Sequence, residues 1–106
     1  EGMKPTFGLG FYSTSKAALT MMTQNMAKEW GPYNIRANTI APGLVKTKFS
    51  EALWSNEQIL NQFLQQVPLQ RIAEPDELAG LAVFLASDAA AYITGSLITV
   101  DGGYVM

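Results

Sequence analysis

The stretch Ile35-Arg-Ala-Asn-Thr-Ile-Ala-Pro-Gly43 indicates the fold class of this chain. It is rich in apolar and β-branched residues, which favours a short buried strand over residues 35–41. Pro42-Gly43 is expected to end that strand, because neither a helix nor a central strand runs readily through this pair. A second run of the same kind, Ser96-Leu-Ile-Thr-Val-Asp101, predicts another strand that Gly102-Gly103 ends.

A long helical pattern precedes the first strand. It extends from Tyr12 to about Trp30 with a wide apolar face, and Gly31-Pro32 is expected to end it. Ser13, Thr14 or Ser15 is the expected cap at its start.

The segment between the two strands is helical but less regular. Residues 44–70 are expected to hold one or two short amphipathic helices, at about 48–55 and 56–66, in a mobile region. Glu74-Pro75-Asp76-Glu77 then places a proline and several acids in the first turn of a helix that runs to about Ser87.

This order of elements predicts an α/β fold. Two strands joined by a long helical crossover form a parallel pair with a right-handed connection. Parallel strands need cover on both faces and usually belong to larger sheets, and no strand precedes the first helix. We therefore expect the C-terminal part of a doubly wound parallel sheet whose front half is absent, with residues 1–106 as a segment of one domain.

Composition excludes several classes of function. The chain has 106 residues, of which 48% are hydrophobic, with a formal net charge of −2 and no basic run, so nucleic acid and anionic membranes are not expected partners. It has no cysteine and no histidine, which argues against disulfides, Ser-His triads and the usual zinc sites. No apolar run approaches the roughly 20 residues of a membrane-spanning helix. We expect a cytoplasmic protein without a metal.

Tyr12 and Lys16 are the first candidate for chemistry. They are four residues apart on the predicted helix, so they share one helix face. A nearby positive charge favours the phenolate and lowers the pKa of a tyrosine from about 10. The pair is therefore a candidate proton donor. Without further motifs, a half-buried aromatic residue and a solvated surface lysine would be the simpler interpretation.

Further motifs make the chain resemble the C-terminal part of the short-chain dehydrogenase/reductase family, which has a Rossmann-type fold. In chain order they are Tyr12-x-x-x-Lys16 with Ala17-Ala18-Leu19; Ile35-Arg36-x-Asn38-x-Ile40-Ala41-Pro42-Gly43-x-Val45-x-Thr47; Arg71-x-x-Glu74-Pro75-x-Glu77-x-Ala79; Phe84-Leu-Ala-Ser-Asp88; Tyr92-Ile93-Thr94-Gly95; and Val100-Asp101-Gly102-Gly103. Each motif is modest alone, but together they cover nearly the whole chain.

The resemblance implies roles for the helix pair. Tyr12 would be the general acid/base of a carbonyl–alcohol interconversion, and Lys16 would hold the nicotinamide ribose hydroxyls and lower the tyrosine pKa. Both would count among the catalytic and the cofactor-binding residues. A phenol that ordinarily titrates near 10 needs such a cation to act as an acid/base near neutral pH, so physical chemistry agrees with the assignment.

The resemblance also implies a cofactor loop. The backbone around Pro42, Gly43 and Val45 would line the nicotinamide, with the main chain of Val45 serving its carboxamide and the Thr47 hydroxyl serving the carboxamide or a phosphate. A plain turn with Thr47 capping the next helix is the alternative, and both can hold. Asn38 and Arg36 are expected to satisfy loop backbone groups.

Residues 44–70 correspond by resemblance to the substrate-binding loop. Phe49, Leu53 and Trp54 could close over a hydrophobic substrate, or they could only tether short helices to the core. Glu74 and Asp76 are expected to be helix-start charges.

The resemblance implies an NAD- or NADP-dependent oxidoreductase that forms a tetramer or dimer and acts on a small carbonyl or alcohol. The glycine-rich phosphate loop, the residue that selects the cofactor and an expected serine before Tyr12 are missing, so the isolated 106-residue chain is expected to be inactive and to need the N-terminal half of the same fold. A non-catalytic remnant acting as an oligomerisation or binding module, and a degraded gene product without function, are the alternatives.

Overall fold

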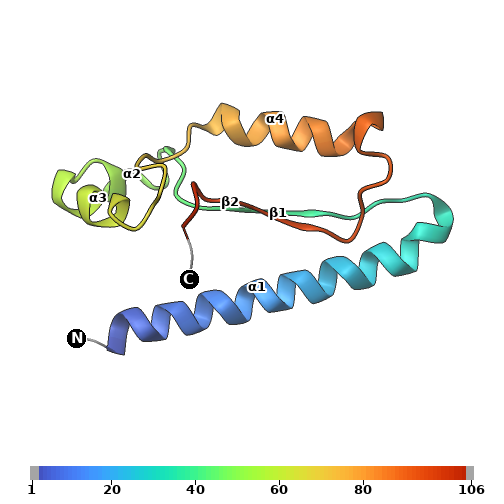
Figure 1. Ribbon diagram of the computed structural model, residues 1–106, viewed down its shortest axis with the longest axis horizontal. Helices are drawn as coiled ribbons and strands as arrows, with labels where there is room; N and C mark the ends of the chain where they lie inside the picture. The colour runs from blue at the N-terminus through green and yellow to red at the C-terminus, as the bar shows by residue number, and fades with distance from the viewer. Residues whose placement is uncertain (1–2, 105–106) are drawn as a thin grey trace. The chain divides into compact units, whose positions relative to one another are not determined.

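The computed structural model describes the backbone of residues 3–104 and the side chains from Thr14 to Tyr104. Its helices and strands, shown in Figure 1, are α1 (Met3–Trp30), the 3-10 helix η1 (Gly31–Tyr33), β1 (Thr39–Pro42), α2 (Glu51–Trp54), α3 (Glu57–Leu64), α4 (Pro75–Ala86), the 3-10 helix η2 (Asp88–Ala90) and β2 (Leu97–Val100).

β1 and β2 pair in parallel, as predicted. The Thr39 amide donates to the Ser96 carbonyl at 2.9 Å, and the Gly43 amide donates to the Val100 carbonyl at 2.8 Å, so both strands run in the same direction. β1 ends at Pro42, where Pro42-Gly43 was expected to end it, but it begins at Thr39, so the predicted start at Ile35 was wrong. The amides of Thr39 and Gly43 both face β2, so by alternation the Pro42 nitrogen faces away and its missing hydrogen costs no bond in the ladder.

Three of the four expected helices agree closely with the sequence, and α1 does not. α2, α3 and α4 fall within the predicted ranges, and α1 ends at Trp30 as expected. The predicted start near Tyr12 was wrong, because α1 already begins at Met3 and its residues 13–15 lie inside the helix rather than capping it. Pro5 stands in the first turn, where amide hydrogens have no intrahelical partner, and glycines weaken a helix without necessarily ending it.

The chain divides into two compact units. Among the described residues, the first contains 3–39 together with Ala91–Ile98, and the second contains Ile40–Ala90 together with 99–104.

In the first unit, α1 contributes a buried threonine. Thr23 is 1% exposed, its hydroxyl donates to the Leu19 carbonyl at 2.7 Å, and it also shares a hydrogen bond with the Thr39 hydroxyl. The buried hydroxyl is therefore fully partnered, as burial requires.

Within the same unit, Asn38 and Arg36 bind the segment that precedes β2. The Asn38 side chain donates to the Ile93 carbonyl at 3.0 Å and accepts from the Ser96 amide at 3.1 Å. Arg36 also donates to the Ile93 carbonyl, at 3.2 Å. This confirms the prediction that these two residues satisfy loop backbone groups.

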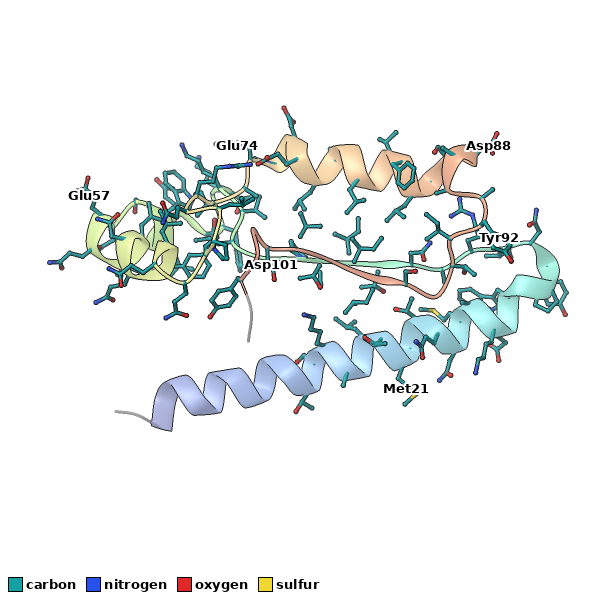
Figure 2. The ribbon with its side chains drawn as sticks, in the orientation of Figure 1. Met21, Glu57, Glu74, Asp88, Tyr92 and Asp101 are labelled. Atoms are coloured by element: carbon teal, nitrogen blue, oxygen red, sulfur yellow. The ribbon has the colours of Figure 1, made fainter. Side chains whose placement is uncertain are left out.

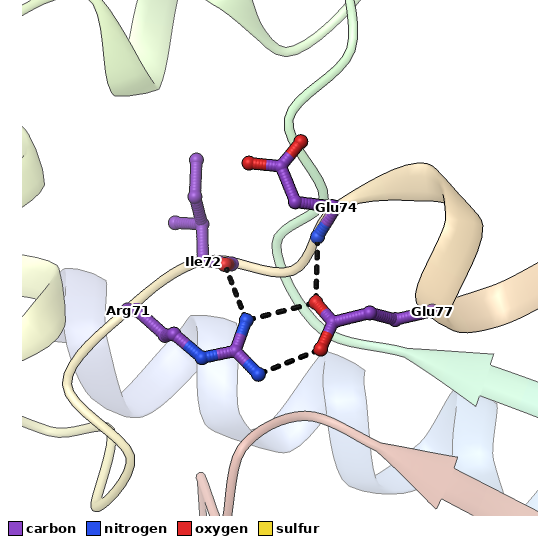
Figure 3. Close-up of polar contacts among 4 residues, drawn as sticks. All are labelled: Arg71, Ile72, Glu74 and Glu77. Carbon is purple, nitrogen blue, oxygen red and sulfur yellow. Dashed lines mark hydrogen bonds and ion pairs between the residues drawn. The ribbon is translucent and has the colours of Figure 1, made fainter.

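In the second unit, an ion pair stabilises the start of α4. Arg71 makes a two-bond contact with the Glu77 carboxylate, at 2.8 and 2.6 Å, and the Glu74 amide donates to the same carboxylate at 2.8 Å (Figure 3). Glu74, which is labelled in Figure 2, precedes the first turn of α4, and Asp76 lies within that turn, as predicted. The Arg71–Glu77 pair was not predicted.

The Arg71–Glu77 pair makes stability depend on pH. The hydrogen bond from Arg71, followed by the one from the Glu74 backbone, lowers the pKa of Glu77 from 4.5 to about 2. A depressed carboxylate pKa stabilises the fold above the unfolded pKa and stops doing so as pH falls through the folded one. We expect Glu77→Gln to destabilise the full-length gene product at neutral pH, and this difference to shrink in urea unfolding as pH falls from about 5 towards about 2.

Glu57→Gln is the matched control for this measurement. Glu57 lies in the first turn of α3 and makes no ion pair with any residue that the structure describes. Because the Arg71–Glu77 pair is exposed, its effect is expected to be small and to weaken with salt. A Glu77→Gln difference that stays constant across this pH range would contradict the assignment.

Candidate active site

Tyr12 and Lys16 lie on one uninterrupted helix. The backbone of α1 is helical through both residues, so they are separated by about one turn and share a face. Lys16 is half-buried. The Tyr12 side chain lies outside the described residues, and its role stays a prediction.

Pro42 and Gly43 lie at the carboxyl end of β1. Gly43 is there for a steric reason, because a Cβ on this residue would come within 2.9 Å of both the Cα and the Cβ of Asp101. Such distances are shorter than real Cβ contacts allow. The two backbones can approach in this way only while residue 43 has no side chain.

The segment after Gly43 is bound to the chain that precedes α4. Val45 and Ala73 form an isolated parallel bridge, with the Lys46 amide donating to the Ala73 carbonyl at 2.9 Å and the Ala73 amide donating to the Leu44 carbonyl at 3.1 Å. These bonds fix the backbone at the predicted cofactor-binding residue Val45.

A tight turn over residues 47–50 follows, and the Ser50 side chain forms hydrogen bonds with the groups around it. The Ser50 hydroxyl donates to the Val45 carbonyl and accepts from the Thr47 amide at 3.1 Å. The Thr47 hydroxyl accepts from the Ser50 amide at 3.3 Å and lies 3.2 Å from the Ser50 hydroxyl. Thr47 therefore lies in a turn, but it does not cap α2, whose N-cap residue is Ser50.

The three predicted substrate-binding side chains differ in their surroundings. The Trp54 indole nitrogen donates to the Thr47 carbonyl at 2.9 Å, and the Lys46 ammonium lies 5.0 Å from the centre of the indole ring. Trp54 is thus held against the turn, with a cation over its ring. Phe49 is fully exposed and Leu53 is about half exposed, so these two have apolar surface left for a ligand.

Ser50 was not among the site residues predicted from the sequence. The available signal was the spacing Thr47-x-x-Ser50 ahead of the apolar residues of α2, because serine and threonine hydroxyls often bond to nearby backbone groups in turns. That signal is weak, since it is equally consistent with an ordinary helix cap.

Among the described residues, no group of three or more acidic side chains is arranged to hold a metal ion. None of their helices combines the length and apolarity needed to cross a membrane.

Gly43→Ala is expected to destabilise the full-length gene product by about 1–3 kcal/mol, because the added methyl group meets the Asp101 backbone and one of the two strands must move. Gly80→Ala is the control, since a Cβ at this position in α4 meets nothing within 4 Å and alanine favours a helix. Thermal unfolding of both variants tests this. Equal stability of Gly43→Ala and the parent would contradict the close approach.

The chain is similar to several oxidoreductases. A family model described as enoyl-(acyl carrier protein) reductase matches residues 3–105. Dehydrogenase/reductase SDR family member 4 of Oryctolagus cuniculus is 46% identical over 99 residues, which make up 93% of this chain and 38% of that protein.

Solved structures show the same likeness. The structure of 4-hydroxyisoleucine dehydrogenase complexed with NADH matches with a TM-score of 0.82 and 36% identity, over 89% of this chain and 39% of that one. An Agrobacterium tumefaciens protein with bound NADP, described as a candidate 2-deoxy-d-gluconate 3-dehydrogenase, matches with a TM-score of 0.79 and 36% identity, over 88% of this chain and 38% of that one. The chain thus spans 38–39% of the length of these three proteins.

Proposed function

This chain belongs to the short-chain dehydrogenase/reductase family, and we propose that its full-length gene product is an NAD(P)-dependent oxidoreductase that interconverts a carbonyl and a secondary alcohol. The observation that carries the proposal is the uninterrupted helix α1, which holds Tyr12 and Lys16 one turn apart with Lys16 half-buried. Relatives named as dehydrogenases, one bound to NADH and one to NADP, support the same conclusion.

Tyr12 is the proposed general acid/base. Its phenol protonates the carbonyl oxygen during reduction, and its phenolate removes the hydroxyl proton during oxidation. Lys16 supplies the positive charge that makes the phenolate accessible near neutral pH, and it also binds the cofactor ribose. The chain has no histidine that could replace the phenol.

The 43–50 segment fits a nicotinamide carboxamide by the chemistry of its donors. Within the described part of the chain, the Val45 amide has no hydrogen-bond partner, and the exposed Thr47 hydroxyl keeps a hydrogen that no short bond uses. A carboxamide presents one acceptor and two donors, so Val45, Thr47 and the neighbouring Pro42-Gly43 backbone are the residues that would hold it. When bound, NAD(P) supplies or accepts the hydride.

Phe49 and Leu53 are the proposed substrate contacts, because their side chains are exposed beside the turn. Trp54, which is half-buried, is proposed to act with them. The 44–70 segment would then be the substrate loop of a single domain to which residues 1–106 belong. Apolar contacts of this kind suit a carbonyl or alcohol with a hydrophobic substituent.

The proposal also includes the oligomeric state and the cellular location of the enzyme. Apolar side chains are exposed on α1 and α4, including Met21, Met22 and Val83, which supports a homo-oligomer, either a tetramer or a dimer. Met21 is labelled on α1 in Figure 2. We also propose a cytoplasmic enzyme, and expect the isolated 106-residue chain to be inactive.

Tyr12→Phe tests the general acid/base. We expect turnover of the full-length gene product with its best cofactor to fall at least about 100-fold, with cofactor affinity nearly unchanged, because only the proton donor is lost. Steady-state assays with NAD and NADP, combined with fluorescence titration of the reduced cofactor, measure both. Tyr33→Phe is the control, since Tyr33 is exposed in η1. Residual turnover within about tenfold of the parent would overturn the assignment.

Lys16→Ala tests the cofactor contact. Losing a charge-assisted hydrogen bond and the nearby cation should weaken reduced-cofactor binding and lower turnover, each by roughly tenfold or more. Lys28→Ala, in the last turn of the same helix, should change neither. Unchanged cofactor affinity in Lys16→Ala would mean that Lys16 does not bind the ribose.

A further inference from the structure

We propose that Ser50 is a positioning residue for the cofactor. Its hydroxyl holds the Val45–Thr47 segment in the shape that leaves the Val45 amide and the Thr47 hydroxyl hydrogen available to the nicotinamide carboxamide. This inference rests on the proposed function, since it specifies how the same site is kept ready.

The Ser50 hydroxyl is fully used inside the turn. Its single hydrogen is directed to the Val45 carbonyl, its shortest contact, with the Thr47 carbonyl as a second acceptor at 3.2 Å, and its oxygen accepts the Thr47 amide at 3.1 Å. Since that hydrogen is directed to a carbonyl, we assign Thr47 as the donor in the 3.2 Å contact between the two hydroxyls. The Thr47 hydrogen is thus held only by a long bond, and rotation of the hydroxyl can redirect it to a ligand.

Ser50 also fixes the acceptor side of Thr47. The Ser50 amide donates to the Thr47 hydroxyl oxygen at 3.3 Å and to the Thr47 carbonyl at 3.2 Å. With one lone pair occupied in this way, the Thr47 hydroxyl is oriented as a donor. A donor suits the carbonyl oxygen of a carboxamide.

Ser50 is not an ordinary helix cap. It occupies the residue before α2, but its side chain accepts no hydrogen bond from the amides of that helix. A serine cap normally accepts from the second or third helical amide. The Ser50 side chain instead bonds back to Val45 and Thr47, so its hydroxyl serves the turn.

The same turn is connected to α2 through Trp54. The Trp54 indole donates to the Thr47 carbonyl, which also accepts the Ser50 amide. The proposed carboxamide-binding groups and the first substrate-loop helix therefore share one hydrogen-bonded unit. Loss of the Ser50 hydroxyl should affect the nicotinamide end of the cofactor more than its adenosine end.

The experiment compares Ser50→Ala, Ser50→Thr and Ser55→Ala in the full-length gene product. Ser55 is a matched control, because it is an exposed serine at the other end of α2 whose side chain makes no hydrogen bond with any residue the structure describes. Calorimetric titration measures the Kd of NADH and of ADP-ribose, or of NADPH and 2′-phospho-ADP-ribose, according to which dinucleotide the parent binds. The second ligand of each pair lacks the nicotinamide.

We expect Ser50→Ala to weaken dinucleotide binding about tenfold while the Kd of the fragment without nicotinamide stays unchanged. Ser50→Thr, which keeps a hydroxyl, should restore much of the loss, and Ser55→Ala should behave like the parent. Unchanged fragment binding also shows that the variant is folded.

Three results would overturn the inference. An unchanged ratio of the two Kd values in Ser50→Ala would remove the positioning role and leave the proposed function intact. An equal loss for both ligands would make Ser50 a general structural residue. A parent protein that binds neither dinucleotide would overturn the proposed function and this inference with it.

Discussion

The close approach of two backbones at Gly43 and Asp101 is the constraint on which the second unit depends. Without a side chain at residue 43, the strand ends meet at a distance that a Cβ would forbid. Glycine is also needed in the turn after Asp101, where Gly102 and Gly103 have positive φ and lie against Val67 and Pro68. Glycine is needed at these positions because other residues would be strained or would clash.

The segment after Gly43 is held in place before any ligand binds. Once the backbone after Gly43 is held by the Val45–Ala73 bridge, its polar groups cannot rearrange freely. Most are satisfied internally by Ser50 and Ala73, which leaves a small, defined set of donors. Groups that are fixed before a ligand arrives cost little reorganisation on binding, which is the usual advantage of a preorganised site.

Local sequence signals predicted most of the fold for identifiable reasons. The two strands have β-branched apolar runs ended by Pro-Gly and Gly-Gly, and α4 begins with Pro75 and acids in its first turn. The predicted starts of two elements were wrong, because local sequence signals near them compete. Serine and threonine at 13–15 suggested a cap, yet they lie inside α1. The apolar run from Ile35 suggested a strand that starts there, yet β1 begins only at Thr39.

By itself, the sequence determined the order of elements, the parallel pairing, the family resemblance and the backbone role of Asn38 and Arg36, because these follow from periodicity, turn residues and motifs close together in the chain. Only the tertiary structure decided that Ser50 organises the turn, that Trp54 is tethered to Thr47, and that Arg71 pairs with Glu77. Those contacts depend on how side chains meet across turns and between elements, and residue identity and spacing allow several partners for each hydroxyl, indole or guanidinium group. Folding selects one partner, because each buried or ordered polar group must be satisfied by whatever the backbone brings within reach.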